Sequence, residues 1–317
     1  SAAYLAVFHT ALAANRVRLA QDVLRLAHYL AQRPNSVLVS LARAGTPVGV
    51  LLKRTLAQVF QQAVPHYSIS IIRDRGIDTQ ALRTLLTRHD PLGRDLVFID
   101  GWTGKGVIAA ELAHWVTAFN QQHQTQISPD LAVLADICGA ATVAATREDY
   151  LIPSALLNST ISGLISRSIL NAAYINVAAG DYHGGRYYQE LAEVDLSRWY
   201  IEQVMAEVMA LAAQTAHQPL PPIVCDEVAR QQQWQVHQQF IHRLLTEYQI
   251  GHVNLLKPGL GEAIRVLLRR LPKAIVLQDA ALPSVQPLLV LAQERQVPVW
   301  IRPDMPYQAL GIIAHVR

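Results

Sequence analysis

The stretch from Asp95 to Glu111, DLVFIDGWTGKGVIAAE, constrains the fold of this chain more than any other. An apolar run over 96–99 ends in Asp100, a loop with three glycines follows, and the loop opens into apolar residues at helical spacing. This order predicts a strand, a loop and a helix. Glycines let a backbone approach a ligand closely, and the free N–H groups of a helix start hold anions. The sequence therefore predicts a phosphate-binding loop beside an acid.

Two common nucleotide-binding loops do not fit this stretch. The P-loop requires a glycine where Ile99 stands and a hydroxyl residue where Gly106 stands, and the dinucleotide fingerprint is absent. The segment resembles the ribose-phosphate loop of type I phosphoribosyltransferases, which bind phosphoribosyl pyrophosphate (PRPP). The resemblance implies that Asp100 binds the ribose and that the loop binds the 5′-phosphate, so the PRPP site would comprise Asp100, Gly101, Trp102, Thr103, Gly104, Lys105 and Gly106. The alternative is an ordinary glycine-rich turn between a strand and a helix.

An earlier strand leads into a second turn of similar character. Residues 36–41 (SVLVSL) predict a buried strand, and a helix is expected from about 48 to 61, with Thr46 and Pro47 at its start. In type I phosphoribosyltransferases the corresponding loop holds pyrophosphate, which would assign that group to Arg43, Ala44, Gly45 and Thr46. After the next strand, 66–72, Arg73 and Arg75 are candidates for a mobile loop over a polyanion. Both sets of arginines have the simpler interpretation of solvated loop charges.

Strands that alternate with helices predict an α/β fold, with a parallel sheet covered on both faces and ligands at the carboxyl ends of the strands. Asp136, at the end of a predicted strand over 131–137, would join this edge. The hydroxyl-rich stretch after the sheet could line the pocket of an acceptor substrate or satisfy buried backbone groups. The candidates for the acceptor pocket are Asp136, Asn158, Ser159 and Thr160.

Composition limits the remaining possibilities. A chain of 317 residues can form two domains, and we place them at 1–216 and 217–317 because HQPLPP, at 217–222, breaks a helix. The net charge of +3 gives no global nucleic-acid signal. Two cysteines, Cys138 and Cys225, form neither a disulfide framework nor a metal motif. With no long apolar run and no signal-peptide pattern, we expect a cytoplasmic protein without membrane contact. The oligomeric state stays open.

The C-terminal region predicts a smaller α/β unit with a strongly amphipathic helix that begins at Gly259-Leu260-Gly261-Glu262. This region resembles the Pelota and L7Ae-type RNA-binding domain, in which a turn of similar pattern at a helix start meets RNA. The resemblance implies an RNA contact through Lys257, Gly259, Gly261, Arg265 and Arg269. A solvated basic helix, or a helix packed on the first domain, is the alternative.

Several segments together resemble one bacterial family along nearly the whole chain: SLARAGTPVGVLLKR, VFIDGWTGKG, ADICGAA, DYLIPSALLNSTISGLISR and VNLLKPGLGEAIRVLLRR. That family is described both as the cysteine protease StiP and as a phosphoribosyltransferase of tellurite-resistance and stress gene clusters. The second description implies an enzyme that transfers ribose-phosphate from PRPP to a nucleobase-like acceptor. Mg²⁺ would then be its cofactor, held through PRPP and not by protein ligands alone.

Two alternatives to transfer remain. A cysteine protease needs a thiolate with a histidine in reach. Cys138 follows a strand and precedes a glycine, with His183 and Asp181 as distant candidate partners. The other alternative keeps the fold as a non-catalytic protein that binds PRPP or a nucleotide. On the specificity of the motifs we favour the phosphoribosyltransferase.

Overall fold

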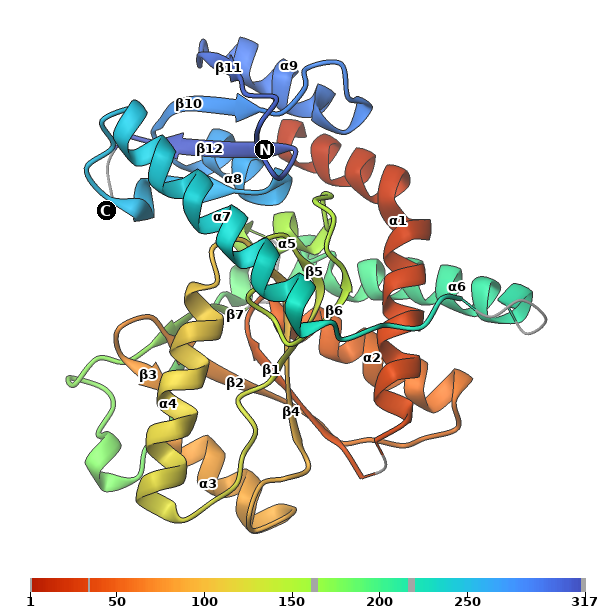
Figure 1. Cartoon of the computed structure of the whole chain (residues 1–317). Coiled ribbons are helices and arrows are strands. Elements are labelled where there is room, and N and C mark those ends of the chain that lie inside the picture. The colour runs from red at the N-terminus through yellow and green to blue at the C-terminus, as the bar shows by residue number, and fades with distance from the viewer. Residues whose placement is uncertain (1, 34, 161–164, 216–219, 315–317) are drawn as a thin grey trace.

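A six-stranded sheet forms the centre of the N-terminal part of the protein, as described by a computed structural model (Figure 1) that covers residues 2–33, 35–160, 165–215 and 220–314. The strand order is β3-β2-β1-β4-β5-β6, and every neighbouring pair except β2 and β3 is parallel. The strands are β1 (Val37–Ala42), β2 (His66–Ile72), β3 (Gly76–Ile77), β4 (Leu96–Thr103), β5 (Leu131–Asp136) and β6 (Val143–Thr146).

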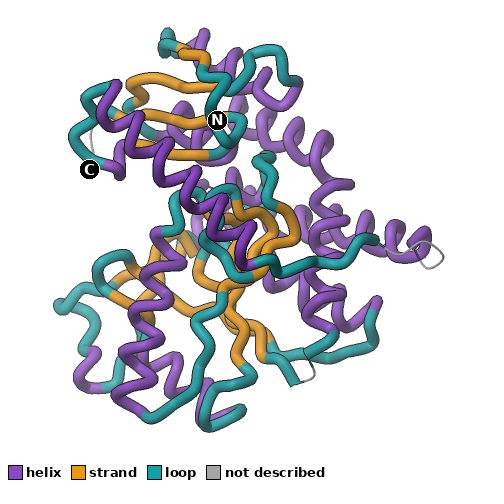
Figure 2. Tube along the Cα trace, viewed as in Figure 1, coloured by secondary structure: helices purple, strands orange, loops and turns teal. Residues whose placement is uncertain are grey.

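Helices cover both faces of this sheet, and Figure 2 shows the strands between two helical layers. The strand β4 shows the reason, since Val97 and Ile99 pack into one hydrophobic core and Leu96 and Phe98 into the other. Runs that are apolar on both sides are typical of parallel strands buried between helices. The first core contains α1 (Ala2–Ala31), α2 (Gly45–Val59) and α6 (Ser197–Thr215), and the second contains α3 (Thr79–Arg88) and α4 (Val107–His123). The predicted α/β class is confirmed.

A second, four-stranded sheet lies in the C-terminal part, with the order β11-β10-β12-β9. Its strands are β9 (Leu256–Pro258), β10 (Pro272–Leu277), β11 (Val299–Ile301) and β12 (Ala309–Ile313), and its helices are α7 (Glu227–Glu247), α8 (Leu260–Arg269) and α9 (Gln286–Glu294). Apolar runs in the sequence predict strands over 274–277 and 297–301, which correspond to β10 and β11, but the sequence does not predict β9 or β12. Both strands are short. β12 pairs antiparallel with β10 and β9, and this pairing cannot be predicted from the local sequence.

A smaller hairpin accompanies the large sheet. It consists of β7 (Ile165–Ile169) and β8 (Gly184–Tyr187), and it follows α5 (Ser154–Thr160). The loop that joins its strands reaches the second helical layer, where Tyr182 shares a hydrogen bond of 2.7 Å with Thr84. In the described part of the chain, the helices are all too short or too polar to cross a bilayer.

The two parts of the protein are joined by a buried carboxylate. Asp149, in the loop after β6, accepts hydrogen bonds from the N–H groups of Leu260, at the start of α8, and of Gln308, just before β12. Both distances are 3.0 Å. Burial raises the pKa of Asp149 to about 6, although these N–H groups oppose the shift. An acid from one part thus caps a helix of the other, at the end where the helix dipole favours negative charge.

The helix α7 crosses both parts, as Figure 1 shows. Its C-terminal half contributes Phe240, Ile241 and Leu244 to the core of the smaller sheet. Its N-terminal half lies on the loop that follows β5, where Gln233 donates a hydrogen bond of 3.0 Å to the carbonyl of Asp136. Displacement of this helix would therefore uncover the end of the large sheet.

Candidate functional site

Three loops meet at the carboxyl edge of the large sheet, after β1, β4 and β5. The turns after β1 and β4 are in direct contact, because a Cβ atom added to Gly45 would lie 2.3 Å from the carbonyl oxygen of Ile99. Gly101 faces the carbonyl of Ala44 in the same way, at 3.3 Å. Only residues without a side chain allow such an approach. The structure therefore brings together the two glycine turns that the sequence singled out.

Asp100 is buried at this edge, with 8% of its surface exposed. Its Oδ1 accepts one hydrogen bond of 2.8 Å, from the N–H of Gly101. Burial raises the pKa of Asp100 to about 7, against the opposing effect of that N–H. A carboxyl group in this environment is partly neutral near pH 7. Asp100 also lines a small cavity between the two parts of the protein, and the ribose contact implied for it stays a prediction.

Asp136 organises the third loop. Its side chain is buried and accepts hydrogen bonds from Thr103 Oγ1 and from the backbone N–H groups of residues 138–141, at 2.9–3.2 Å for the backbone donors. A carboxylate that receives so many donors fixes the loop in one conformation. Asp136 therefore holds the loop together, which differs from the acceptor-pocket role predicted for it.

Cys138 lies inside this loop with none of its surface exposed. Its Sγ is 3.5 Å from Asp136 Oδ1 and 3.6 Å from Thr103 Oγ1. Burial, and then the charge of Asp136, raise the pKa of the Cys138 thiol well above its usual range. The thiol is therefore protonated at neutral pH, whereas a reactive cysteine requires the thiolate. The second cysteine, Cys225, is exposed near α1, with its Sγ 3.7 Å from the hydroxyl of Tyr29.

The N-terminal half of α7 covers Cys138. A Cβ atom on Gly139 would lie 2.4 Å from the carbonyl oxygen of Arg230 and 2.7 Å from the backbone nitrogen of Trp234, so helix and loop are in backbone contact. Arg230 Nη1 also donates a hydrogen bond of 3.2 Å to the carbonyl of Gly139. The left-handed φ of Gly139, +79°, is a second reason for glycine at this position.

The same helix buries a histidine near the loop. His237 is 1% exposed, and its ring centroid is 5.9 Å from those of both Trp234 and Tyr307. Burial lowers the pKa of His237 to about 4, with Asp136 opposing the shift. In the described part of the chain its Nδ1 has no hydrogen-bond partner. The imidazole is thus neutral at pH 7, and burial makes it a weaker base than an exposed histidine.

Sequence reasoning missed His237. The one available signal is that Trp234, His237, Phe240 and Leu244 share the buried face of a helix, but the sequence does not indicate what that face covers. We instead named His183 and Asp181 as partners of Cys138. Their described contacts lie elsewhere, since Asp181 accepts from the N–H of Asn176 and His183 binds Ser70.

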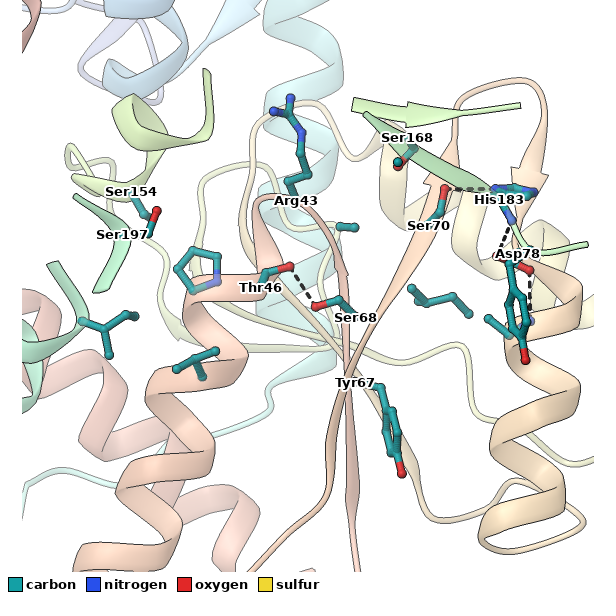
Figure 3. Close-up of a pocket in the computed structure, with 18 of the residues that line it drawn as sticks. Arg43, Thr46, Tyr67, Ser68, Ser70, Asp78, Ser154, Ser168, His183 and Ser197 are labelled. Carbon is teal, nitrogen blue, oxygen red and sulfur yellow. Dashed lines mark hydrogen bonds between the residues drawn. The ribbon is translucent and has the colours of Figure 1, made fainter. Parts of the chain in front are cut away.

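His183 lines a large cavity of about 1020 Å³ on the β1–β2 side of the sheet. Figure 3 shows Ser70, His183 and Asp78 on one wall and Thr46, bonded to Ser68, on another. Ser70 Oγ is 2.9 Å from His183 Nδ1. However, Asp78 accepts from the backbone N–H of His183 and not from its ring, so these residues do not form a catalytic triad. Arg43 and Thr46, predicted to hold pyrophosphate, line this cavity as well.

The remaining predicted residues are distributed between the two parts of the protein. Arg75 is exposed, while the side chains of Asn158, Ser159 and Thr160 lie outside the described residues. Arg269 is half-buried. Gly259 and Gly261, proposed to meet RNA, face the first part, where added Cβ atoms would lie 3.0 Å from Ile137 and 3.4 Å from Ala155. A smaller cavity of about 220 Å³ lies between the parts. It is lined by residues of the predicted PRPP loop, the candidate mobile loop and the predicted RNA contact: Asp100, Trp102, Thr103, Gly104, Lys105 and Gly106, then Arg73, and then Lys257 and Arg265.

Replacing Gly139 with alanine is expected to lower the free energy of unfolding by about 3 kcal/mol, because the new Cβ meets the α7 backbone and the residue must keep a left-handed φ. The displaced helix should also expose Cys138, so iodoacetamide should label this thiol at least about tenfold faster than in the wild type. Urea denaturation and mass spectrometry of the alkylated peptides measure the two effects.

Gly180 provides the matched control. It has a similar φ of +93°, but nothing lies within 4 Å of an added Cβ atom. Gly180→Ala should therefore cost only about 1 kcal/mol and leave the labelling of Cys138 unchanged. Equal effects of the two substitutions would contradict the role assigned to the contact between Gly139 and α7.

Comparison with solved structures gives only weak similarities. The hypoxanthine phosphoribosyltransferase of Trypanosoma cruzi matches 43% of this chain and 82% of its own, with 15% identity and a TM-score of 0.32. A hypoxanthine-guanine phosphoribosyltransferase from Bacillus anthracis covers 43% of this chain and 81% of its own, with 13% identity and a TM-score of 0.32. Similarities this low do not assign a function.

Sequence comparison is more specific. Residues 1–205 match the family model of the tellurite-like stress resistance cysteine protease StiP, and residues 235–315 match the PELOTA RNA binding domain. A protein from Acinetobacter baylyi (strain ATCC 33305 / BD413 / ADP1), named "Cysteine protease StiP", is 40% identical over 323 residues, which cover 99% of this chain and 82% of the relative. The predicted Pelota-like domain is therefore confirmed.

These matches overturn the predicted activity. The family and the relative are named as cysteine proteases, so the prediction of a phosphoribosyltransferase was wrong, and the PRPP and magnesium deduced from that activity lose their support. The error arose because a glycine-rich loop at a sheet edge specifies a backbone shape and not a reaction. Because a family model matches residues 1–205 and a relative is 40% identical over 99% of this chain, the chain belongs to the StiP family of tellurite-like stress resistance cysteine proteases.

Proposed function

We propose that this protein is a cysteine peptidase in which Cys138 is the nucleophile and His237 accepts its proton. The observation that carries the proposal is that both residues are buried, Cys138 under α7 and His237 on that helix, and that the carboxylate of Asp136 acts on both. That carboxylate contacts the Cys138 thiol and opposes the burial-driven fall in the pKa of His237. The names of the family and of the relative support the reaction class.

The alternative cysteine is less suitable. Cys225 lies just before α7, and its described side-chain contact is with the hydroxyl of Tyr29. A peptidase needs a nearby group that removes the thiol proton during attack. A tyrosine hydroxyl, whose pKa is raised here first by burial, is a poor base at neutral pH. Cys138 contacts a carboxylate, Asp136, that also acts on the pKa of His237.

The chemistry follows from a neutral thiol and a neutral imidazole. As Cys138 Sγ bonds to the carbonyl carbon of a peptide, the thiol proton moves to a ring nitrogen of His237. The C–N bond then breaks, and the leaving amine takes that proton, which leaves a thioester on Cys138. Water, deprotonated by His237, attacks the thioester and releases the acid and the free thiol.

The described conformation corresponds to a latent enzyme under this proposal. Cys138 has no exposed surface, and burial holds its thiol in the protonated form. A peptide can reach Sγ only if the N-terminal half of α7 moves away from the loop at 138–141. That movement would also admit water, which weakens the burial effect on the pKa of both Cys138 and His237.

The test is hydrolysis of unfolded, fluorescently labelled casein by the full-length protein and its variants. Cys138→Ala should abolish cleavage, whereas Cys225→Ala should keep the wild-type rate. His237→Gln should lower the rate about 100-fold or more, the usual contribution of a general base. Gly139→Ala, in which α7 is loosened, should cleave faster than the wild type.

Two results would disprove the proposal. One is a Cys138→Ala variant that cleaves casein as fast as the wild type. The other is an absence of cleavage by both the wild type and the loosened Gly139→Ala variant, once circular dichroism shows that each is folded.

A further inference from the structure

The cavity between the two parts of the protein carries an excess of positive charge. Arg73 and Lys105 line it from the N-terminal part, and Lys257 and Arg265 line it from the C-terminal part. Of the acids that line it, Glu262 is paired with Arg265, and Asp100 is partly neutral because burial raises its pKa to about 7. Four basic side chains thus line about 220 Å³ together with two acidic ones, and one of the acids is already paired.

The described hydrogen bonds of Arg73 and Lys105 are to uncharged groups. Lys105 Nζ donates to the carbonyl of Val253 at 3.0 Å and to Asn254 Oδ1 at 3.2 Å. Arg73 Nη1 donates to the same Asn254 oxygen at 3.1 Å. These acceptors are uncharged, so they satisfy hydrogen bonds without compensating charge. Burial lowers the pKa of Lys105 to about 7, and the charges of Lys257 and Arg73 lower it further. Such an arrangement favours an anion as the missing partner.

The backbone around the cavity also suits an anion. The loop at 104–106 runs directly into α4, and Gly106, with a φ of +72°, precedes the first turn of that helix. The helix start therefore adds the positive end of its dipole to the side-chain charges. The opposite wall is close, because an added Cβ on Gly104 would lie 3.1 Å from the carbonyl oxygen of Pro258. A ligand here would touch both parts of the protein at once.

We propose that this cavity binds a compact oligophosphate, a small molecule with two or more linked phosphate groups, held jointly by Arg73, Lys105, Lys257 and Arg265. Linked phosphates supply several negative charges in a small volume and accept the paired hydrogen bonds of arginine. The site is separate from the reaction at Cys138. It joins residues that the sequence assigned to two different ligands, a sugar phosphate and RNA.

A small ligand fits this site better than an RNA strand. The glycine turn before α8 is packed on the N-terminal part, and Leu260, at the start of α8, is fully buried. Single-stranded nucleic acid binds along open grooves with stacking surfaces, whereas this cavity lies between two packed walls. The ligand therefore reaches the site as a free small molecule.

Binding at this position has a mechanical consequence. The ligand bridges the loop at 103–106 and the β9–α8 segment, and Thr103 of that loop contacts the Cys138 thiol at 3.6 Å. An oligophosphate would hold the two parts closed and keep Cys138 covered. It should therefore slow the alkylation of Cys138 in the full-length protein, whether or not the protein has peptidase activity.

Titration calorimetry of the full-length protein with inorganic pyrophosphate tests the proposal. Lys257→Gln and Arg265→Gln should each raise the pyrophosphate Kd about tenfold or more, the effect of losing a charged hydrogen bond. Lys273→Gln is the matched control, because Lys273 is an exposed cation on β10 that does not line the cavity. It should leave Kd unchanged. Melting curves confirm that each variant is folded.

Pyrophosphate at about three times its wild-type Kd should also slow iodoacetamide labelling of Cys138 about threefold in the wild type, but much less in Lys257→Gln, which binds little of it at that concentration. The proposal is overturned if millimolar pyrophosphate does not bind, or if Lys273→Gln weakens binding as much as Lys257→Gln does. It is equally overturned if a single-stranded RNA oligonucleotide binds more tightly than pyrophosphate and displaces it, which would identify a nucleic-acid surface. Loss of casein cleavage in Cys138→Ala has no bearing on either measurement.

Discussion

Replacing Asp136 with alanine is expected to lower the free energy of unfolding by on the order of 4 kcal/mol. The carboxylate is buried and accepts four backbone N–H groups of the loop at 138–141 as well as the hydroxyl of Thr103. Its removal leaves these donors unsatisfied in a site that water does not reach. Each such donor costs about 1–3 kcal/mol, which partial relaxation of the loop reduces. The midpoint of urea denaturation, followed by circular dichroism, measures the loss.

Asp130 provides the control for this prediction. It lies just before β5, the strand that Asp136 ends, is exposed, and accepts hydrogen bonds from the hydroxyls of Ser128 and Thr142. Asp130→Ala should change stability by less than about 1 kcal/mol, as surface substitutions usually do. If Asp136→Ala were equally mild, the loop around Cys138 would not depend on this carboxylate, and the organising role given to Asp136 would have to be abandoned.

Replacing Asp100 with asparagine is expected to stabilise the protein, by an amount that depends on pH. Burial raises the pKa of Asp100 in the folded protein to about 7, whereas an unfolded aspartate titrates near 3.9. Between these values the folded state binds more protons than the unfolded state. The contribution of Asp100 to stability is therefore full below about pH 4 and is lost as the pH rises through 7. Asparagine cannot ionise and avoids this loss.

The expected gain of Asp100→Asn over the wild type is on the order of 4 kcal/mol at pH 8 and close to zero at pH 4. Asp22 and Asp149 also have pKa values raised by burial, to about 6, but both remain in the variant and cancel in the difference. Urea denaturation of both proteins at pH 4, 6 and 8 measures the trend. A gain that is the same at all three values would show that Asp100 does not carry the buried charge.

The sequence predicted the large sheet and its connections well. The strand-forming runs that include Phe98 and Val133 are apolar on both faces, which is typical of parallel strands buried between helices. The loop after β4 was predictable because its glycines lie close together in the sequence. The convergence of the turns after β1 and β4 was also predictable, because the carboxyl ends of parallel strands share one edge. The identity of the reaction was not. The family is named for a cysteine protease, which makes Cys138 a candidate nucleophile. In the sequence, however, Cys138 resembles an ordinary small core residue.

By itself, then, the sequence determined the α/β class, the four central strands β1, β2, β4 and β5 of the large sheet, and the presence of a smaller C-terminal unit, because each depends on periodicity and turn residues within a few positions. Only the tertiary structure decided that α7 covers Cys138 and places His237 near Asp136, and that Lys105 and Lys257 line one cavity. Each of these arrangements brings together residues that are about 100–150 positions apart in the sequence. Such contacts depend on how the two parts pack. Burial and nearby charges in the folded protein then shift the pKa values of these groups, and the local sequence does not reveal those shifts.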